Sequence, residues 1–314
     1  MDKNSKIFVI GDKDILRGSF IRYFQENGFN NVLDNISSNI NLMSQDAVRS
    51  FFKKEKPEYV FLNHIKSSGI AANIKYPAEF IYTNLQVQNN VIQASFESKV
   101  GKLLFLSSSC IYPAGSTQPI KESCLLKGEL EGTSSFHAVS KIAGIKMCEA
   151  YHRQYGMNFV SAVPATIYGP EDDFDSEGAH VISALIKKFD QARLQKAQQA
   201  VVWGRGSARR EFIYINDLIE AEIFLMKNYN LPGIINLGVG EDISIGDLAV
   251  SIKDIVGFKG EIIFDELKPE GVSKKLLDSS RINKLGWEAK TTLDEGIRQT
   301  YEWYKKFKEE GIKR

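Results

Sequence analysis

The sequence predicts an α/β protein with a doubly wound, Rossmann-type parallel sheet and a smaller, discontinuous substrate-binding domain. The main observation is that short apolar runs alternate with helical patterns through the first half of the chain. That alternation is typical of a parallel sheet covered on both faces by helices. The length of 314 residues, with 43% hydrophobic and 25% charged residues, fits one large globular unit or two coupled ones.

The elements of the first half follow in a regular order. Five strands are expected at residues 6–10, 31–33, 59–62, 102–106 and 159–162. Apolar residues at helical spacing predict helices over 19–26, 47–54, 85–95 and 137–155. These strands and helices alternate as βαβ units, so we expect one parallel sheet whose ligands bind beyond the carboxyl ends of its strands.

The second half of the chain is less regular. It contains a polar loop over 171–179, a helix over 181–191, turn signals over 231–240 and an amphipathic helix over 293–307. We expect residues 1–167 and about 210–240 to form the nucleotide-binding domain. Residues 168–209 and 241–314 would form the substrate domain, with the segment near 210–218 returning to the sheet.

Charge and composition exclude several function classes. The chain has 40 basic and 39 acidic residues, so it carries no overall field that attracts nucleic acid or anionic lipid. No apolar run approaches the roughly 20 residues of a membrane-spanning helix. Three scattered cysteines are too few for a disulfide framework or a cysteine-based zinc site. We therefore expect a cytoplasmic protein without a metal, a nucleic-acid partner or a membrane partner.

The loop after the first strand has the position of a dinucleotide-binding turn. Gly11 and Gly18 bracket six residues, among them Lys13 and two aspartates. Glycines there permit close approach of a pyrophosphate to a helix N-terminus, whereas carboxylates repel it. The loop is thus either a phosphate-binding turn or a capped βα turn without a ligand. Asp34, after the second strand, suits ribose hydroxyls and favours NAD over NADP, or it is a simple turn residue.

A group of chemically active side chains follows the fourth strand. Ser108 and Cys110 come directly after it, where a doubly wound sheet presents its ligand site. His137 and Lys141 are four residues apart on a predicted helix, so they share one face. Taken singly, a buried cysteine and an exposed helix lysine are ordinary structural features. The combination of these four side chains is not an ordinary structural feature.

These residues lie in stretches that resemble the extended short-chain dehydrogenase/reductase (NAD-dependent epimerase/dehydratase) family, and within it the GDP-L-fucose synthases. The resemblance runs from about residue 6 to residue 304. The specific stretches are 108–113 (SSCIYP), 141–146 (KIAGIK), 151–156 (YHRQYG), 180–182 (HVI), 201–204 (VVWG), 210–212 (REF) and 275–278 (KLLD). Together they are far more specific than a lone glycine motif.

The resemblance implies epimerisation at C3 and C5 and reduction at C4 of a GDP-4-keto-6-deoxy sugar. It assigns Ser108 and Lys141 to the reductive site, with His137 at the position of the family's tyrosine acid. It assigns Cys110 and His180 to epimerisation. The cofactor implied is NADP(H) or NAD(H), held by Gly11, Lys13, Gly18, Asp34 and Lys141. The substrate residues implied are Ser109, Trp203, Arg210 and Lys268. A homodimer through the helices near 84–96 and 137–155 is also implied.

The departures from the family pattern fall on the cofactor side and leave three interpretations open. The first is a working epimerase/reductase with His137 as a variant acid. The second is an epimerase that uses Cys110 and His180 without a dinucleotide. The third is a non-catalytic paralogue that only binds a ligand or a partner.

Overall fold

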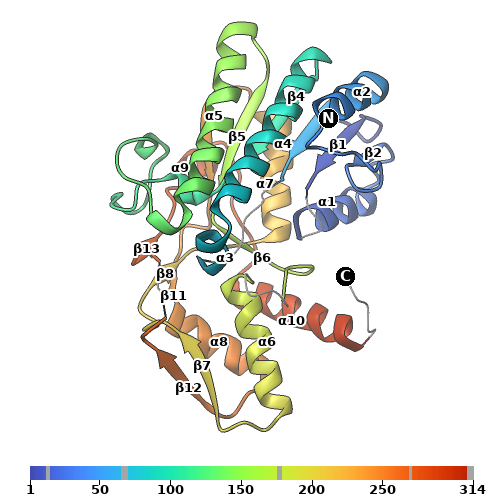
Figure 1. Cartoon of the computed structure of the whole chain (residues 1–314). Coiled ribbons are helices and arrows are strands. Elements are labelled where there is room, and N and C mark those ends of the chain that lie inside the picture. Colours follow the sequence, from blue (N-terminus) through green and yellow to red (C-terminus); the bar gives the residue numbers. More distant parts are fainter. Residues whose placement is uncertain (12–14, 65–69, 175–178, 269–270, 310–314) are drawn as a thin grey trace.

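The computed structural model describes residues 1–11, 15–64, 70–174, 179–268 and 271–309 and is built around a six-stranded parallel sheet (Figure 1). The strand order is β10-β5-β4-β3-β1-β2. The strands are β1 (Ile7–Ile10), β2 (Val32–Asp34), β3 (Tyr59–Leu62), β4 (Lys102–Leu106), β5 (Phe159–Pro164) and β10 (Ile234–Leu237). The predicted Rossmann-type α/β fold is confirmed.

Helices cover both faces of this sheet. They are α1 (Ile15–Glu26), α2 (Gln45–Glu55), α4 (Pro77–Glu97), α5 (Ser135–Tyr155) and α7 (Ile215–Asn228). The short α3 (Ile70–Lys75) contacts α4 and the turn that precedes α5. On one face, α1 contacts α7 and places Phe20 against Phe61 of β3. On the other face, Phe52 of α2 contacts Phe8 of β1. On that face too, Gly144 lets α5 approach the Phe105 ring so closely that a Cβ would not fit. The strand residues are buried on both faces, which explains their continuous apolar runs.

The remaining elements lie outside the main sheet, most of them at the other end of the molecule, whereas α9 packs beside the edge strand β10 (Figure 1). Three small sheets contain β6 (Thr166–Tyr168) with β9 (Phe212–Tyr214), β7 (Gln199–Trp203) with β12 (Glu261–Asp265), and β8 (Arg209–Arg210) between β11 (Ile243–Ser244) and β13 (Lys274–Lys275). The helices are α6 (Val181–Leu194), α8 (Ile245–Val256), α9 (Ser280–Lys284) and α10 (Leu293–Glu309). Figure 1 shows α6, α8, β7 and β12 gathered below the main sheet.

The five strands expected in the first half are β1 to β5, and helices occur over all six expected stretches. Residues 210–218 form the end of β8, then β9, which pairs with β6, and then the start of α7, which packs against β4 and β5 of the main sheet. After β5, the next strand of the chain that joins the main sheet is β10, which pairs with β5 at the edge of the sheet. Within the described ranges, no helix is long and apolar enough to cross a membrane.

Candidate functional site

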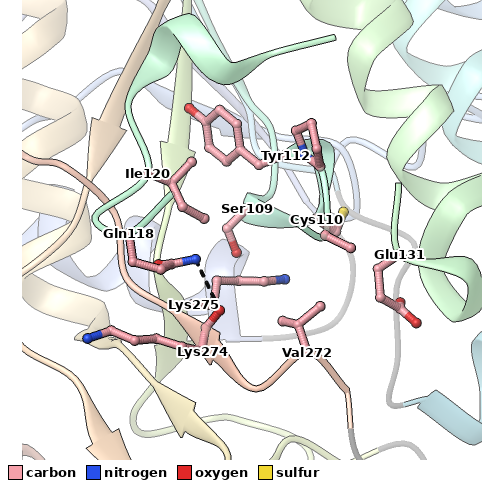
Figure 2. Close-up of a pocket in the computed structure, with 11 residues that line it drawn as sticks. Ser109, Cys110, Tyr112, Gln118, Ile120, Glu131, Val272, Lys274 and Lys275 are labelled. Carbon is pink, nitrogen blue, oxygen red and sulfur yellow. Dashed lines mark hydrogen bonds between the residues drawn. The ribbon is translucent and has the colours of Figure 1, made fainter. Parts of the chain in front are cut away.

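A pocket opens where the chain leaves β4. A short 3-10 turn, Ser109–Ile111, follows the strand, and the Ser108 hydroxyl accepts a hydrogen bond from the Cys110 amide at 3.5 Å. Ser109 and Cys110 line the pocket together with Glu131 and Lys275 (Figure 2). The hydroxyl, the thiol and the two charged groups therefore meet at the carboxyl end of a buried strand, where this fold class binds its ligands.

Lys275, the second residue of β13, changes the electrostatics of the Cys110 thiol. Burial raises the pKa of Cys110, while the charge of Lys275, a hydrogen bond with Ser108 and the charge of Lys141 act in the opposite direction. Burial also lowers the pKa of Lys275, whereas the charge of the Cys110 thiolate raises it. Burial disfavours the charged form of each group, and each charge stabilises the other. The charge of Lys275 therefore favours the thiolate form of Cys110 within the pocket that both residues line.

Lys141 and His137 lie on the buried side of α5, as their spacing predicts. The Lys141 ammonium donates to the carbonyl oxygens of His64 at 2.8 Å and Leu106 at 3.1 Å, directly after β3 and at the end of β4. It also lies 4.9 Å from the centre of the Phe105 ring. These contacts hold the ammonium at the carboxyl edge of the sheet.

A hydrogen bond sets the tautomer of His137. The amide nitrogen of Asn84 donates to the Phe80 carbonyl at 2.8 Å, which fixes the orientation of that amide. The same nitrogen lies 3.3 Å from His137 Nδ1. Because an amide nitrogen only donates, Nδ1 accepts, and the proton of the neutral ring lies on Nε2. His137 thus has the tautomer of a proton donor at Nε2.

His180 immediately precedes α6 and pairs with a buried carboxylate. Its Nδ1 lies 3.4 Å from Oδ1 of Asp172, a residue that is only 4% exposed. The other oxygen of Asp172 accepts from the Ser183 hydroxyl. Among the described residues, His180 is not part of the pocket that holds Cys110. The structure therefore gives His180 an orienting partner but does not bring it to the thiol.

The predicted substrate residues divide into two groups. Arg210 of β8 pairs with Lys275 of β13, and its charge lowers the pKa of that lysine, but Arg210 does not itself line the Cys110 pocket. Trp203, at the end of β7, is 52% exposed, and the Lys268 ammonium lies 5.3 Å from its ring. An exposed indole with a cation beside it suits a flat base and its phosphates.

Gly11 and Gly18, the two glycines of the predicted dinucleotide-binding turn, both lie against side chains of this chain. The Gly11 amide donates to the side-chain oxygen of Asn35 at 3.0 Å. At Gly18 a Cβ would meet the Glu171 carboxylate, so this glycine makes room for the loop after β6. Lys13 lies outside the described residues.

Asp34 ends β2 and is a fixed, charged group. Its Oδ1 accepts from the amides of Ile36 and Ser37 at 2.9 and 3.0 Å, and from the Arg17 guanidinium at 3.1 Å. Burial by itself would raise the pKa of Asp34, but the hydrogen bonds and Arg17 hold it below its ordinary value. The carboxylate is therefore ionised at neutral pH. No cluster suited to a metal ion occurs among the residues that the structure describes.

The chain is similar to known proteins over nearly its whole length. Residues 22–238 match the NAD dependent epimerase/dehydratase family. GDP-L-fucose synthase 1 of Arabidopsis thaliana is 46% identical over 305 residues, which cover 97% of this chain and 94% of that protein. A GDP-6-OMe-4-keto-L-xylo-heptose reductase from Campylobacter jejuni has a TM-score of 0.93 and 38% identity, with 98% of this chain and 99% of that chain covered. The GDP-mannoheptose C4 reductase of the same organism, solved with NADP bound, has a TM-score of 0.89 and 39% identity over 97% of this chain and 99% of that chain.

Proposed function

Because the chain belongs to the NAD dependent epimerase/dehydratase family, we propose that it acts on a GDP-4-keto-6-deoxy sugar. The reaction is epimerisation of the carbons beside the keto group, reduction of that group, or both. Relatives named as GDP-L-fucose synthases and GDP-heptose reductases support the GDP-sugar substrate. The observation that supports the chemistry best is the Cys110 thiol in a pocket beside Lys275 and next to Ser108.

Epimerisation begins with removal of a proton from a carbon next to the ketone. In the proposed step the Cys110 thiolate takes this proton, so a C–H bond breaks, an S–H bond forms and the electron pair moves onto the keto oxygen. The Ser108 hydroxyl donates a hydrogen bond to that oxygen and stabilises the enolate. Lys275 stabilises the thiolate against the burial that favours the neutral thiol.

Inversion requires a second group that returns a proton to the opposite face of the carbon. We assign this step to His180. Its Nδ1 donates to Asp172, so in the imidazolium form the second proton lies on Nε2, and this is the proton that His180 gives up to leave the neutral ring protonated on Nδ1. The N–H bond breaks, the new C–H bond forms and the electron pair returns from the keto oxygen. Proton exchange with water then restores both side chains.

Keto reduction requires a nicotinamide dinucleotide, and the donors and acceptors present fit its two riboses. The ionised Asp34 at the end of β2 is an acceptor for ribose hydroxyls, and the Lys141 ammonium at the ends of β3 and β4 is a donor. When bound, the dinucleotide supplies hydride to the keto carbon. His137 would then donate its Nε2 proton to the keto oxygen, in the position where the family has a tyrosine.

A homodimer through α4 and α5 is part of the proposal. The two helices lie side by side (Figure 1). Four large apolar or aromatic side chains on them are between 46% and 62% exposed: Tyr82, Phe136, Val139 and Tyr155. Burial of these side chains against a second copy would remove apolar surface from water. Sedimentation velocity of the wild type and of a Tyr82→Glu/Val139→Glu variant tests this: we expect a dimer and a monomer, respectively.

Deuterium uptake tests the epimerase half of the proposal. GDP-4-keto-6-deoxymannose incubated with the protein in D₂O should gain deuterium at C3 or C5 faster than in the enzyme-free control. Cys110→Ser should abolish the gain. Cys124→Ser, a free cysteine outside the pocket, should not. Absence of uptake with the wild-type protein would contradict epimerisation.

A second assay separates reduction from epimerisation. We expect wild type to oxidise added reduced dinucleotide in the presence of the keto-sugar, and His137→Phe to lose this oxidation while it keeps deuterium uptake. Deuterium uptake by wild type without oxidation would identify an epimerase that works without a dinucleotide. Binding of the GDP-sugar with neither activity would identify a non-catalytic paralogue.

A further inference from the structure

The end of β2 differs in charge from a site that binds a 2′-phosphate. Between Arg22 and Arg49 the chain has no lysine or arginine, and this interval contains β2 and the whole turn that follows it. A dinucleotide site that accepts the 2′-phosphate of NADP has a cation next to this strand end, whereas a site for NAD has a carboxylate there. Here the residue at the strand end is Asp34.

The structure places the Arg17 guanidinium next to Asp34, and the two groups already form an ion pair. Its guanidinium lies 3.1 Å from Oδ1 of Asp34, and Asp34 is only 6% exposed. If Arg17 turned toward a 2′-phosphate, it would leave a nearly buried carboxylate without its ion-pair partner. Removal of one partner from a buried ion pair is strongly destabilising. The phosphate would also be repelled by the Asp34 charge.

The same contacts prepare Asp34 to bind an unphosphorylated ribose. The amides of Ile36 and Ser37 and the Arg17 guanidinium all reach Oδ1, which holds the carboxylate in one orientation. An ionised carboxylate has about four acceptor positions. It therefore retains acceptor capacity for the ribose hydroxyls of NAD.

We propose that Asp34, held by Arg17, makes this chain selective for NAD(H) over NADP(H). The related GDP-mannoheptose C4 reductase was solved with NADP bound, so the proposal separates this chain from that relative. It rests on the proposed function only in that a nicotinamide dinucleotide binds. It is independent of the sugar and of whether Cys110 epimerises it.

Calorimetric titration tests the proposal without any turnover. The purified chain is first stripped of dinucleotide and then titrated separately with NADH and NADPH. We expect NADH to bind at least ten-fold more tightly. Asp34→Asn should weaken NADH binding about ten-fold and reduce the preference to near unity. Asp46→Asn removes the same charge from an exposed position on α2 and should keep the wild-type preference.

A second variant, designed to gain NADPH binding, keeps the proposal testable if Asp34→Asn fails to fold. Ser37 is exposed, and its backbone amide still donates to Asp34 in Ser37→Arg, although the hydrogen bond from the serine side chain to Asp34 is lost. Ser37→Arg adds a cation to the same turn and should tighten NADPH binding at least five-fold, with little change in thermal midpoint. Equal or tighter binding of NADPH by wild type would overturn the proposal, as would no binding of either dinucleotide. Failure of deuterium uptake would instead count against the proposed function alone.

Discussion

Lys275 and Cys110 line one pocket although they belong to β13 and to the turn after β4, far apart in the chain. The charge of Lys275 favours the thiolate of Cys110, and that of the thiolate favours the ammonium. Burial opposes both charges. The reactivity of the Cys110 thiol therefore depends on Lys275, which β13 places in the pocket after β4.

Replacement of Lys275 by methionine should slow deuterium uptake ten- to one hundred-fold at neutral pH. Burial already raises the pKa of Cys110, and loss of the neighbouring charge raises it further, so less thiolate is present. Alkylation of Cys110 by iodoacetamide, followed by mass spectrometry of the Cys110 peptide, should slow in parallel. Lys127→Met, at an exposed position, is the control. An unchanged alkylation rate in Lys275→Met would contradict this role.

Glu222 in α7 makes stability depend on pH. It is fully buried, and burial raises its pKa from 4.5 to about 8. Between these two values the folded chain keeps a proton that the unfolded chain has lost. Stability therefore falls as pH rises, by about 1.4 kcal/mol per pH unit for this group. Glu222→Gln should remove this slope and stabilise the protein most above pH 8.

Urea unfolding at pH 5.5, 7 and 8.5 measures the effect of Glu222→Gln. Glu220→Gln, on the same helix but partly exposed, is the matched control and should leave the slope in place. A variant that is less stable than wild type at pH 8.5 would show that the Glu222 carboxyl is not a buried neutral acid.

The carboxylate of Glu211 joins segments from three parts of the chain. Its Oε1 accepts from the amides of Val239 at 2.7 Å and Gly240 at 2.8 Å, and its Oε2 accepts from Leu277 at 2.9 Å. In Glu211→Gln the side-chain NH₂ must face one of these N–H groups, which leaves a buried donor without an acceptor. We expect a loss of about 1–3 kcal/mol in unfolding free energy.

Chemical denaturation checks the Glu211→Gln prediction, with Glu241→Gln in the adjacent exposed loop as control. Leu277 follows Lys275 by two residues, so deuterium uptake should fall as well. Unfolding midpoints that agree between variant and wild type would show that the three amide bonds contribute nothing to stability.

The main sheet could be predicted from sequence because β1, β3 and β4 are continuous apolar runs between helical patterns. The strand β10 was less visible, since its four residues lie between Gly233 and Gly238 and were interpreted only as part of a turn-rich segment. Cys110 could be found from the motif around it. Lys275 could be recognised only as part of a family-like stretch. Its place beside Cys110 depends on the packing of a two-residue strand, which has no local periodicity.

We expect Asp172 to act as a positioning residue for His180. Its two oxygens are held by the Ser183 hydroxyl and the Asp173 amide, and Oδ1 faces His180 Nδ1. In Asp172→Asn the amide would no longer require a proton on Nδ1, so the ring would lose its preferred tautomer. We expect kcat for deuterium uptake to fall at least ten-fold with little change in KM.

The tautomer itself gives a readout that a merely structural role would not change. The chain has four histidines, so nitrogen NMR of protein with ¹⁵N-labelled histidine can be assigned by single substitutions. In wild type His180 should be protonated on Nδ1, and in Asp172→Asn it should show a mixture of tautomers. Asp173→Asn, at the exposed neighbouring position, should leave both the spectrum and the rate unchanged. A His180 spectrum that is identical in Asp172→Asn and wild type would mean that the carboxylate does not orient the ring, whatever happens to the rate.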